Sequence, residues 1–156
     1  MQEAILYFCC RTSEGIKLNR IKFDINIIGF MSVFENITHA KLKDCMTTPN
    51  GLLFIVEPNE IAKAIGKQGQ NAKRLEHVLK KKIKIVEFSP EVGQFIRNLL
   101  HPLQVDEIEE AGNGLVILKG RDTQSKSMII GRSASNLRGT EEIVKRYFPI
   151  EEIKII

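Results

Sequence analysis

The chain has 156 residues, which suits one medium-sized domain or two small ones. A hydrophobic fraction of 43% beside 27% charged residues is typical of a globular chain with its own core and argues against wholesale disorder. The formal net charge of +4 permits a polyanionic partner, whereas an aromatic content of 6% without Trp argues against reading bases mainly by aromatic stacking.

Residues 1 to 21 carry no pattern that assigns them, and we treat them as an unassigned N-terminal arm. The apolar run over 4–10 is too short to span a membrane and follows an acidic residue, so we expect neither a membrane anchor nor a signal peptide. The three cysteines form no Cys-x-x-Cys pair, which argues against a disulfide framework and against a zinc site. We therefore expect a cytoplasmic protein without metal or cofactor.

From residue 25 onward, the spacing of apolar residues predicts secondary structure. Apolar residues between Ile27 and Ile37 recur at i, i+3, i+4 and i+7, which is one face of an amphipathic helix. The first half of the chain is predicted to contain a helix over 25–38, strands over 41–46 and 52–56, helices over 59–65 and 70–81, and a strand over 83–88. In the helix over 70–81 the predicted core positions are Ala72, Leu75, Val78 and Leu79.

A short cationic break separates the helices over 59–65 and 70–81, and it reads Gly66-Lys67-Gln68-Gly69. The two glycines let the backbone reach conformations that are closed to residues with a Cβ, and they let a ligand approach the main chain. The following helix directs its free N–H groups into the break, which suits a phosphate group. On spacing alone, an ordinary turn between two helices explains the two glycines equally well.

Positive charge is concentrated around this break. Between Ile61 and Val86 there are eight basic residues against one acid, Glu76, whereas the next stretch is mainly acidic. The eight are Lys63, Lys67, Lys73, Arg74, Lys80, Lys81, Lys82 and Lys84. For the three consecutive lysines, the solvated end of a helix is an equally good interpretation.

The chain repeats itself at an offset of 65 residues. The offset places Ile65-Gly66-Lys67 on Ile130-Gly131-Arg132, and Asn71 on Asn136. It also carries the first helix onto a later one, so that helices are predicted over 91–100, 123–130 and 135–148. The helix at the start of the repeated unit and the loop near its end match at the same offset. We therefore predict two copies of one domain, over 22–88 and 89–156.

The second copy of the break departs from the first at its closing position, where Ala134 replaces Gly69. A Cβ there is expected to restrict the backbone and to add a methyl group where a phosphate would approach. We interpret the second break as a degraded version of the first, with phosphate still within reach of Arg132, Arg138 and Lys126.

The Ile-Gly-Lys-x-Gly-x-Asn-x-Lys pattern, with a strand-like run on each side, resembles the KH nucleic-acid-binding module, in which this loop clamps the backbone of unstacked nucleotides. The order helix, strand, strand, helix, loop, helix, strand resembles the type II, prokaryotic form. The resemblance implies an α+β fold of two tandem type II KH domains, each a three-stranded sheet packed by three helices. It implies RNA-binding residues at Ile65, Gly66, Lys67, Gln68, Gly69, Asn71, Lys73, Arg74, Ile130, Gly131, Arg132, Ser133 and Arg138.

Two such modules that fill nearly the whole chain resemble the archaeal NusA-like transcription factors. Further cues are the segments 33–38, 86–89 and 145–148. The resemblance implies binding of single-stranded nascent RNA during transcription elongation or termination. The S1 and polymerase-binding domains of bacterial NusA have no counterpart in this sequence, which leaves RNA polymerase as a candidate partner only.

Other functions fit the sequence less well. The nucleotide-binding and nucleophile motifs of enzymes are missing, so we expect neither catalysis nor a small-molecule substrate. A ribosome-associated or ribosome-assembly protein that holds rRNA with the same modules is the alternative. A protein scaffold that has lost RNA binding is a third reading, against which the intact Gly66 and Gly69 pair argues.

Overall fold

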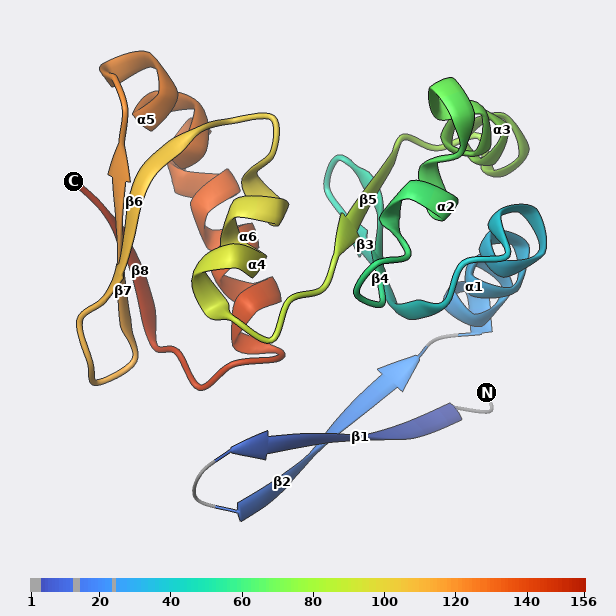
Figure 1. Ribbon diagram of the computed structural model, residues 1–156, viewed down its shortest axis with the longest axis horizontal. Helices are drawn as coiled ribbons and strands as arrows, with labels where there is room; N and C mark the ends of the chain where they lie inside the picture. Colours follow the sequence, from blue (N-terminus) through green and yellow to red (C-terminus); the bar gives the residue numbers. More distant parts are fainter. Residues whose placement is uncertain (1–3, 13–14, 24) are drawn as a thin grey trace. The chain divides into compact units, whose positions relative to one another are not determined.

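The computed structural model describes residues 4–12, 15–23 and 25–156. The chain divides into two compact units, Met1–Phe88 and Ser89–Ile156. Figure 1 shows strands and helices in both units. None of the helices within the described ranges is long and apolar enough to cross a membrane.

The N-terminal segment contains a hairpin that the sequence left unassigned. Strand β1 (Ala4–Thr12) pairs antiparallel with β2 (Gly15–Phe23), so that Ala4 lies opposite Phe23. Strand β1 contains a continuous apolar run over 4–10, which periodicity alone does not assign to a strand. Residues 1–3, 13–14 and 24, which include part of the unassigned arm, lie outside the described residues.

The first unit contains a three-stranded sheet of order β3-β4-β5. Strands β3 (Leu42–Thr48) and β4 (Gly51–Val56) are antiparallel, and β4 is parallel to β5 (Ile83–Glu87). The helices are α1 (Ile25–Thr38), α2 (Ile61–Ile65) and α3 (Gln70–Leu79). The predicted order of elements is therefore found, with element ends within two residues of the prediction.

The core of this unit lies between the sheet and the helices. Phe34 of α1 stacks on Phe54 of the central strand with ring centroids 4.6 Å apart, and both side chains are fully buried. The same cluster includes Leu52, Val56 and Leu75. Because every residue of β4 from Leu52 to Val56 is buried, both faces of the strand are covered, and it reads as a continuous apolar run without polar alternation.

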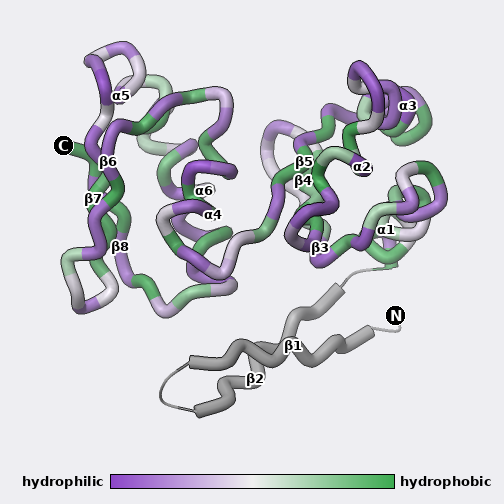
Figure 2. Tube along the Cα trace, viewed as in Figure 1, coloured by the Kyte–Doolittle hydropathy of each residue, from purple (hydrophilic) through white to green (hydrophobic). Residues whose placement is uncertain are grey.

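One predicted core position in α3 is wrong. Leu75 is fully buried, but Val78 is 50% exposed. The helix contacts α1, α2 and β5 along a narrow stripe, and a residue three positions after Leu75 falls beside that stripe whereas Leu79, four positions after it, stays on it. Along α3 hydrophobic and hydrophilic segments consequently alternate (Figure 2).

The second unit repeats the arrangement with a sheet of order β6-β7-β8. Its strands are β6 (Val105–Glu110), β7 (Leu115–Gly120) and β8 (Glu152–Ile155), and its helices are α4 (Val92–Leu100), α5 (Thr123–Ile130) and α6 (Ser135–Lys145). Within this unit α4 and α6 lie to one side of the strands (Figure 1). Both units are thus α+β.

Helix α6 ends at Lys145, three residues earlier than predicted. Pro149 disfavours helical dihedrals in the residue before it, which shortens the helix. The rings of Tyr147 and Phe148 lie 5.6 Å and 5.8 Å from that of Phe95. The aromatic pair after the helix therefore belongs to the core of the second unit.

Both sheets contain an irregularity at the same place. The antiparallel register shifts between Leu42 and Asp44 in β3, and between Val105 and Glu107 in β6. Each shift leaves one residue, Lys43 or Asp106, out of the ladder, which is the pattern of a β-bulge. The repeat therefore extends to a backbone defect as well as to the order of elements.

Candidate nucleic-acid interface

The first glycine loop leaves α2 through a backbone conformation that is essentially restricted to glycine. Gly66 has φ 74° and ψ 176°. Gln68 (φ 54°, ψ 25°) and Gly69 (φ 74°, ψ 20°) follow in the left-handed region, and α3 begins at Gln70. The chain thus turns sharply between two helices within four residues.

The second loop has the same backbone shape. Gly131 has φ 71° and ψ −178°, Ser133 has φ 52° and ψ 33°, and Ala134 has φ 59° and ψ 24°. Alanine at the closing position therefore takes the same left-handed conformation as Gly69 in the first loop. The left-handed region costs alanine roughly 1–2 kcal/mol but does not exclude it. What distinguishes the second loop at this position is a methyl group.

Each loop presents two consecutive backbone donors. Among the described residues, the N–H groups of Lys67 and Gln68 have no hydrogen-bond acceptor, and the same holds for Arg132 and Ser133. The next N–H in each loop donates back across the turn at 3.3 Å, from Gly69 to the Gly66 carbonyl in the first loop and between the equivalent positions in the second. Successive N–H groups in a right-handed then left-handed turn form a concave anion-binding site.

Cations without an acidic partner gather at these loops. Lys67, Lys73 and Arg74 are exposed and form no ion pair with any described residue. By contrast, Lys63 pairs with Glu60 at 3.8 Å at the start of α2. The first loop therefore carries positive charge that no acidic side chain among the described residues neutralises.

The structure brings the predicted residues of each unit together around its own loop. Ile65, the last residue of α2, is 38% exposed beside Gly66 and offers an apolar contact next to the donors. In the second unit, Arg132 and Arg138 are likewise exposed and form no ion pair with the described residues, but Ile130 is half-buried. Ile65 to Arg74 form one cluster and Ile130 to Arg138 another.

Asn71, which is among the predicted residues, and its equivalent Asn136, which is not, both have side-chain amides that already donate a hydrogen bond within the protein. Asn71 Nδ2 donates to the Lys63 carbonyl at 3.0 Å, and Asn136 Nδ2 donates to the Met128 carbonyl at 2.9 Å. Sequence reasoning missed these two carbonyls, which belong to the last turns of α2 and α5. The only available signal was an asparagine five residues after the first glycine in both copies.

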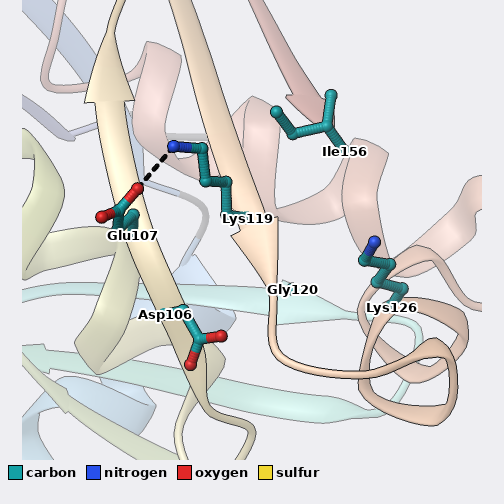
Figure 3. Close-up of a pocket in the computed structure, with 6 residues that line it drawn as sticks. All are labelled: Asp106, Glu107, Lys119, Gly120, Lys126 and Ile156. Atoms are coloured by element: carbon teal, nitrogen blue, oxygen red, sulfur yellow. Dashed lines mark hydrogen bonds and ion pairs between the residues drawn. The ribbon is translucent and has the colours of Figure 1, made fainter.

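A polar pocket of about 550 Å³ lies elsewhere in the second unit (Figure 3). Within it, Lys119 Nζ lies 2.5 Å from a Glu107 carboxylate oxygen, and this hydrogen bond lowers the pKa of Glu107 and raises that of Lys119. Lys126 also lines the pocket, against Gly120, whereas Arg132 is not among its lining residues. With Asp106 and Glu107 in its wall, the pocket does not favour an anion.

Within the described ranges, no three His, Cys, Asp or Glu side chains come together to hold a metal ion. Cys45, the one cysteine whose side chain is described, is buried.

Comparison with known proteins agrees with this geometry. The sequence model of the KH domain matches residues 31–110, about half of the chain, which includes the first loop. Proteins named "Probable transcription termination protein NusA" are similar: that of Methanocaldococcus jannaschii is 33% identical over 135 residues, covering 85% of this chain and 72% of that protein. That of Methanococcus vannielii is 30% identical over 139 residues, covering 88% and 80%.

A solved structure, described as the crystal structure of APE1850, is also similar, with a TM-score of 0.69 and 27% identity. The match covers 86% of this chain and all of that one. The match to the KH model and the identity to the archaeal relatives over most of this chain lead to one conclusion: this chain belongs to the KH-domain family, as a NusA-like KH protein.

Proposed function

We propose that this protein binds single-stranded RNA with its two loops during transcription elongation or termination. Each unit acts as a type II KH domain, the first over 22–88 and the second over 89–156. The observation that carries the proposal is the pair of open donors at Lys67 and Gln68, surrounded by cations without acidic partners. The names of the archaeal relatives support the link to transcription.

The loop acts by holding the RNA backbone. A phosphate oxygen accepts hydrogen bonds from the N–H groups of Lys67 and Gln68, while the ammonium group of Lys67 and the first turns of α3 supply positive charge. Exposed Ile65 offers apolar surface to a base. Backbone clamping of this kind suits an unpaired strand, whose bases are splayed out. The protein is accordingly a binding factor and not an enzyme.

The second loop should bind more weakly than the first. It keeps the backbone donors, but Ala134 adds a methyl group, and Gly139 stands at the position equivalent to Arg74. One methyl group and one missing cation reduce contact and charge without removing the site. We therefore rank the first loop as the principal RNA site.

The test replaces donor-bearing residues by aspartate and measures the dissociation constant for one short single-stranded RNA. Lys67→Asp with Gln68→Asp should weaken binding by more than about tenfold, because carboxylates repel phosphate. Arg132→Asp with Ser133→Asp should cost less. Circular dichroism checks that each variant is folded.

The matched control is Lys80→Asp with Lys81→Asp, which introduces two acids at the other end of α3. This control should weaken binding much less than the change at Lys67 and Gln68. Equal losses would mean that a diffuse positive field, and not a clamp, holds the RNA. Co-purification with RNA polymerase tests the transcription role, and recovery with ribosomal particles instead would favour the ribosomal alternative.

A further inference from the structure

At the end of helix α2, the backbone alone cannot provide a hydrogen-bond donor for every carbonyl group. In a continuing α-helix the Lys63 carbonyl would accept from the N–H of Lys67, four residues later. Here the chain turns away at Gly66, whose N–H makes the last bond of the helix, to the Ala62 carbonyl at 3.0 Å. The Lys63 carbonyl is instead satisfied by Asn71 Nδ2 at 3.0 Å.

The second unit shows the same arrangement independently. The Gly131 N–H donates to the Ser127 carbonyl at 2.9 Å, and Asn136 Nδ2 donates to the Met128 carbonyl at 2.9 Å. In both units an asparagine at the start of the second helix therefore replaces the backbone N–H that the turn has removed from the first helix.

The first glycine of each loop and this asparagine fit each other closely. A Cβ placed on Gly66 would lie 2.9 Å from both Cγ and Nδ2 of Asn71, and one on Gly131 would lie 2.6 Å from Asn136 Cγ. A side chain at the glycine would push the amide off the carbonyl. Glycine is thus required here by the contact with asparagine as well as by the dihedral angles.

We propose that Asn71 and Asn136 are positioning residues that hold each loop in its RNA-binding shape. By capping the Lys63 and Met128 carbonyls, they keep the N–H groups of Lys67 and Arg132 from closing another helical turn and leave them available to a phosphate. This inference rests on the proposed RNA function, but it assigns the asparagines a role within the loop and not a contact with RNA.

The test uses Asn71→Ala and Asn136→Ala, with Asn71→Asp as a variant of the same shape that cannot donate when ionised. Amide NMR spectra of the RNA-free protein are recorded first. We expect the signals of residues 66 to 69 to shift or broaden in both Asn71 variants, and those of 131 to 134 in Asn136→Ala. Lys73→Ala is the matched control on α3, and it should leave the RNA-free loop signals unchanged.

Titration with the same short RNA then follows. We expect Asn71→Ala to weaken binding about three- to tenfold, the range for loss of one hydrogen bond that orders a site. Weaker binding with unchanged RNA-free loop signals would overturn the proposal, because Asn71 would then contact RNA itself. Moved loop signals with unchanged affinity would overturn it too, provided that Lys67→Asp with Gln68→Asp weakens binding by more than about tenfold as expected.

If Lys67→Asp with Gln68→Asp has no effect on RNA affinity, the proposed function fails. The RNA-free spectra still decide whether the asparagines hold the loops. The two failures are therefore distinguishable.

Discussion

The free-energy cost of a left-handed backbone at the closing position of each loop can be measured by placing alanine in the first loop and glycine in the second. Gly69 and Ala134 both lie in the left-handed region, at φ 74° and φ 59°. A Cβ added to Gly69 would meet none of the described atoms within 4 Å, so that a change to alanine alters backbone strain and not packing. Gly69→Ala should therefore destabilise the first unit, and Ala134→Gly should stabilise the second.

The expected size is about 1 kcal/mol in each direction, since this is the cost of placing alanine in the left-handed region after allowing for the entropy of glycine in the unfolded chain. For units of this size that corresponds to a shift of about 4–8 °C in the unfolding temperature of the unit concerned. Gly66→Ala is the contrasting variant and should cost more than about 2 kcal/mol, because its dihedral angles suit only glycine and its Cβ would strike Asn71.

Urea titration monitored by amide NMR signals from each unit measures the change in unfolding free energy of each unit separately. The slope of unfolding free energy against urea concentration should stay unchanged. Ala134→Gly should also tighten RNA binding at the second loop by removing the methyl group. A loss of stability in Ala134→Gly, or no change, would refute the reasoning, because Ala134 would then not occupy the left-handed conformation in solution.

Three further predictions concern packing, acid stability and salt. Leu75→Ala should cost about 2–5 kcal/mol of unfolding free energy because Leu75 is fully buried, whereas Val78→Ala should cost less than about 1 kcal/mol; equal losses in urea would contradict the assignment. The Ser125 N–H donates to Asp122 at the start of α5, and this hydrogen bond lowers the pKa of Asp122. The hydrogen bond to the ionised carboxylate therefore stabilises the fold above the ordinary carboxyl pKa, and this stabilisation is lost as the pH falls through the lowered pKa. Asp122→Asn keeps the N-cap acceptor and should flatten this acid dependence in unfolding midpoints measured from pH 6 downward. The slope of log affinity against log salt should stay shallower than about −7, the value for ten phosphates on a single strand, because few phosphates fit a four-residue loop.

The fold was predictable where the local pattern and the tertiary packing agree. The helices over 25–38 and 123–130 have the predicted bounds, because apolar spacing in the first and the repeat in the second leave little choice. Val78 shows the limit, since a helical pattern gives a direction but not the width of the face that its neighbours cover. In the N-terminal hairpin, the apolar run of β1 carries no period, so periodicity alone did not assign that strand.

For the loops, the sequence located the two turns but not the conformation and hydrogen bonds of their residues. Glycine spacing and the repeat located Gly66 and Gly131, whose positive φ values only glycine adopts readily. The left-handed conformation of Ala134 and the hydrogen bond of Asn71 depend on the path of two helices that pack together, and no short pattern encodes that path.

The matching bulges in β3 and β6 have a consequence for solubility. Each of these strands is an edge strand of its own sheet, and an edge is where a sheet can recruit a strand from another molecule. An extra residue at Lys43 or Asp106 breaks the regular spacing of donors and acceptors, so that an incoming strand cannot continue the ladder in register. In β6 the exposed carboxylates of Asp106, Glu107, Glu109 and Glu110 add charge repulsion between copies. Each of the two three-stranded sheets thus has a bulged edge strand that opposes edge-to-edge aggregation.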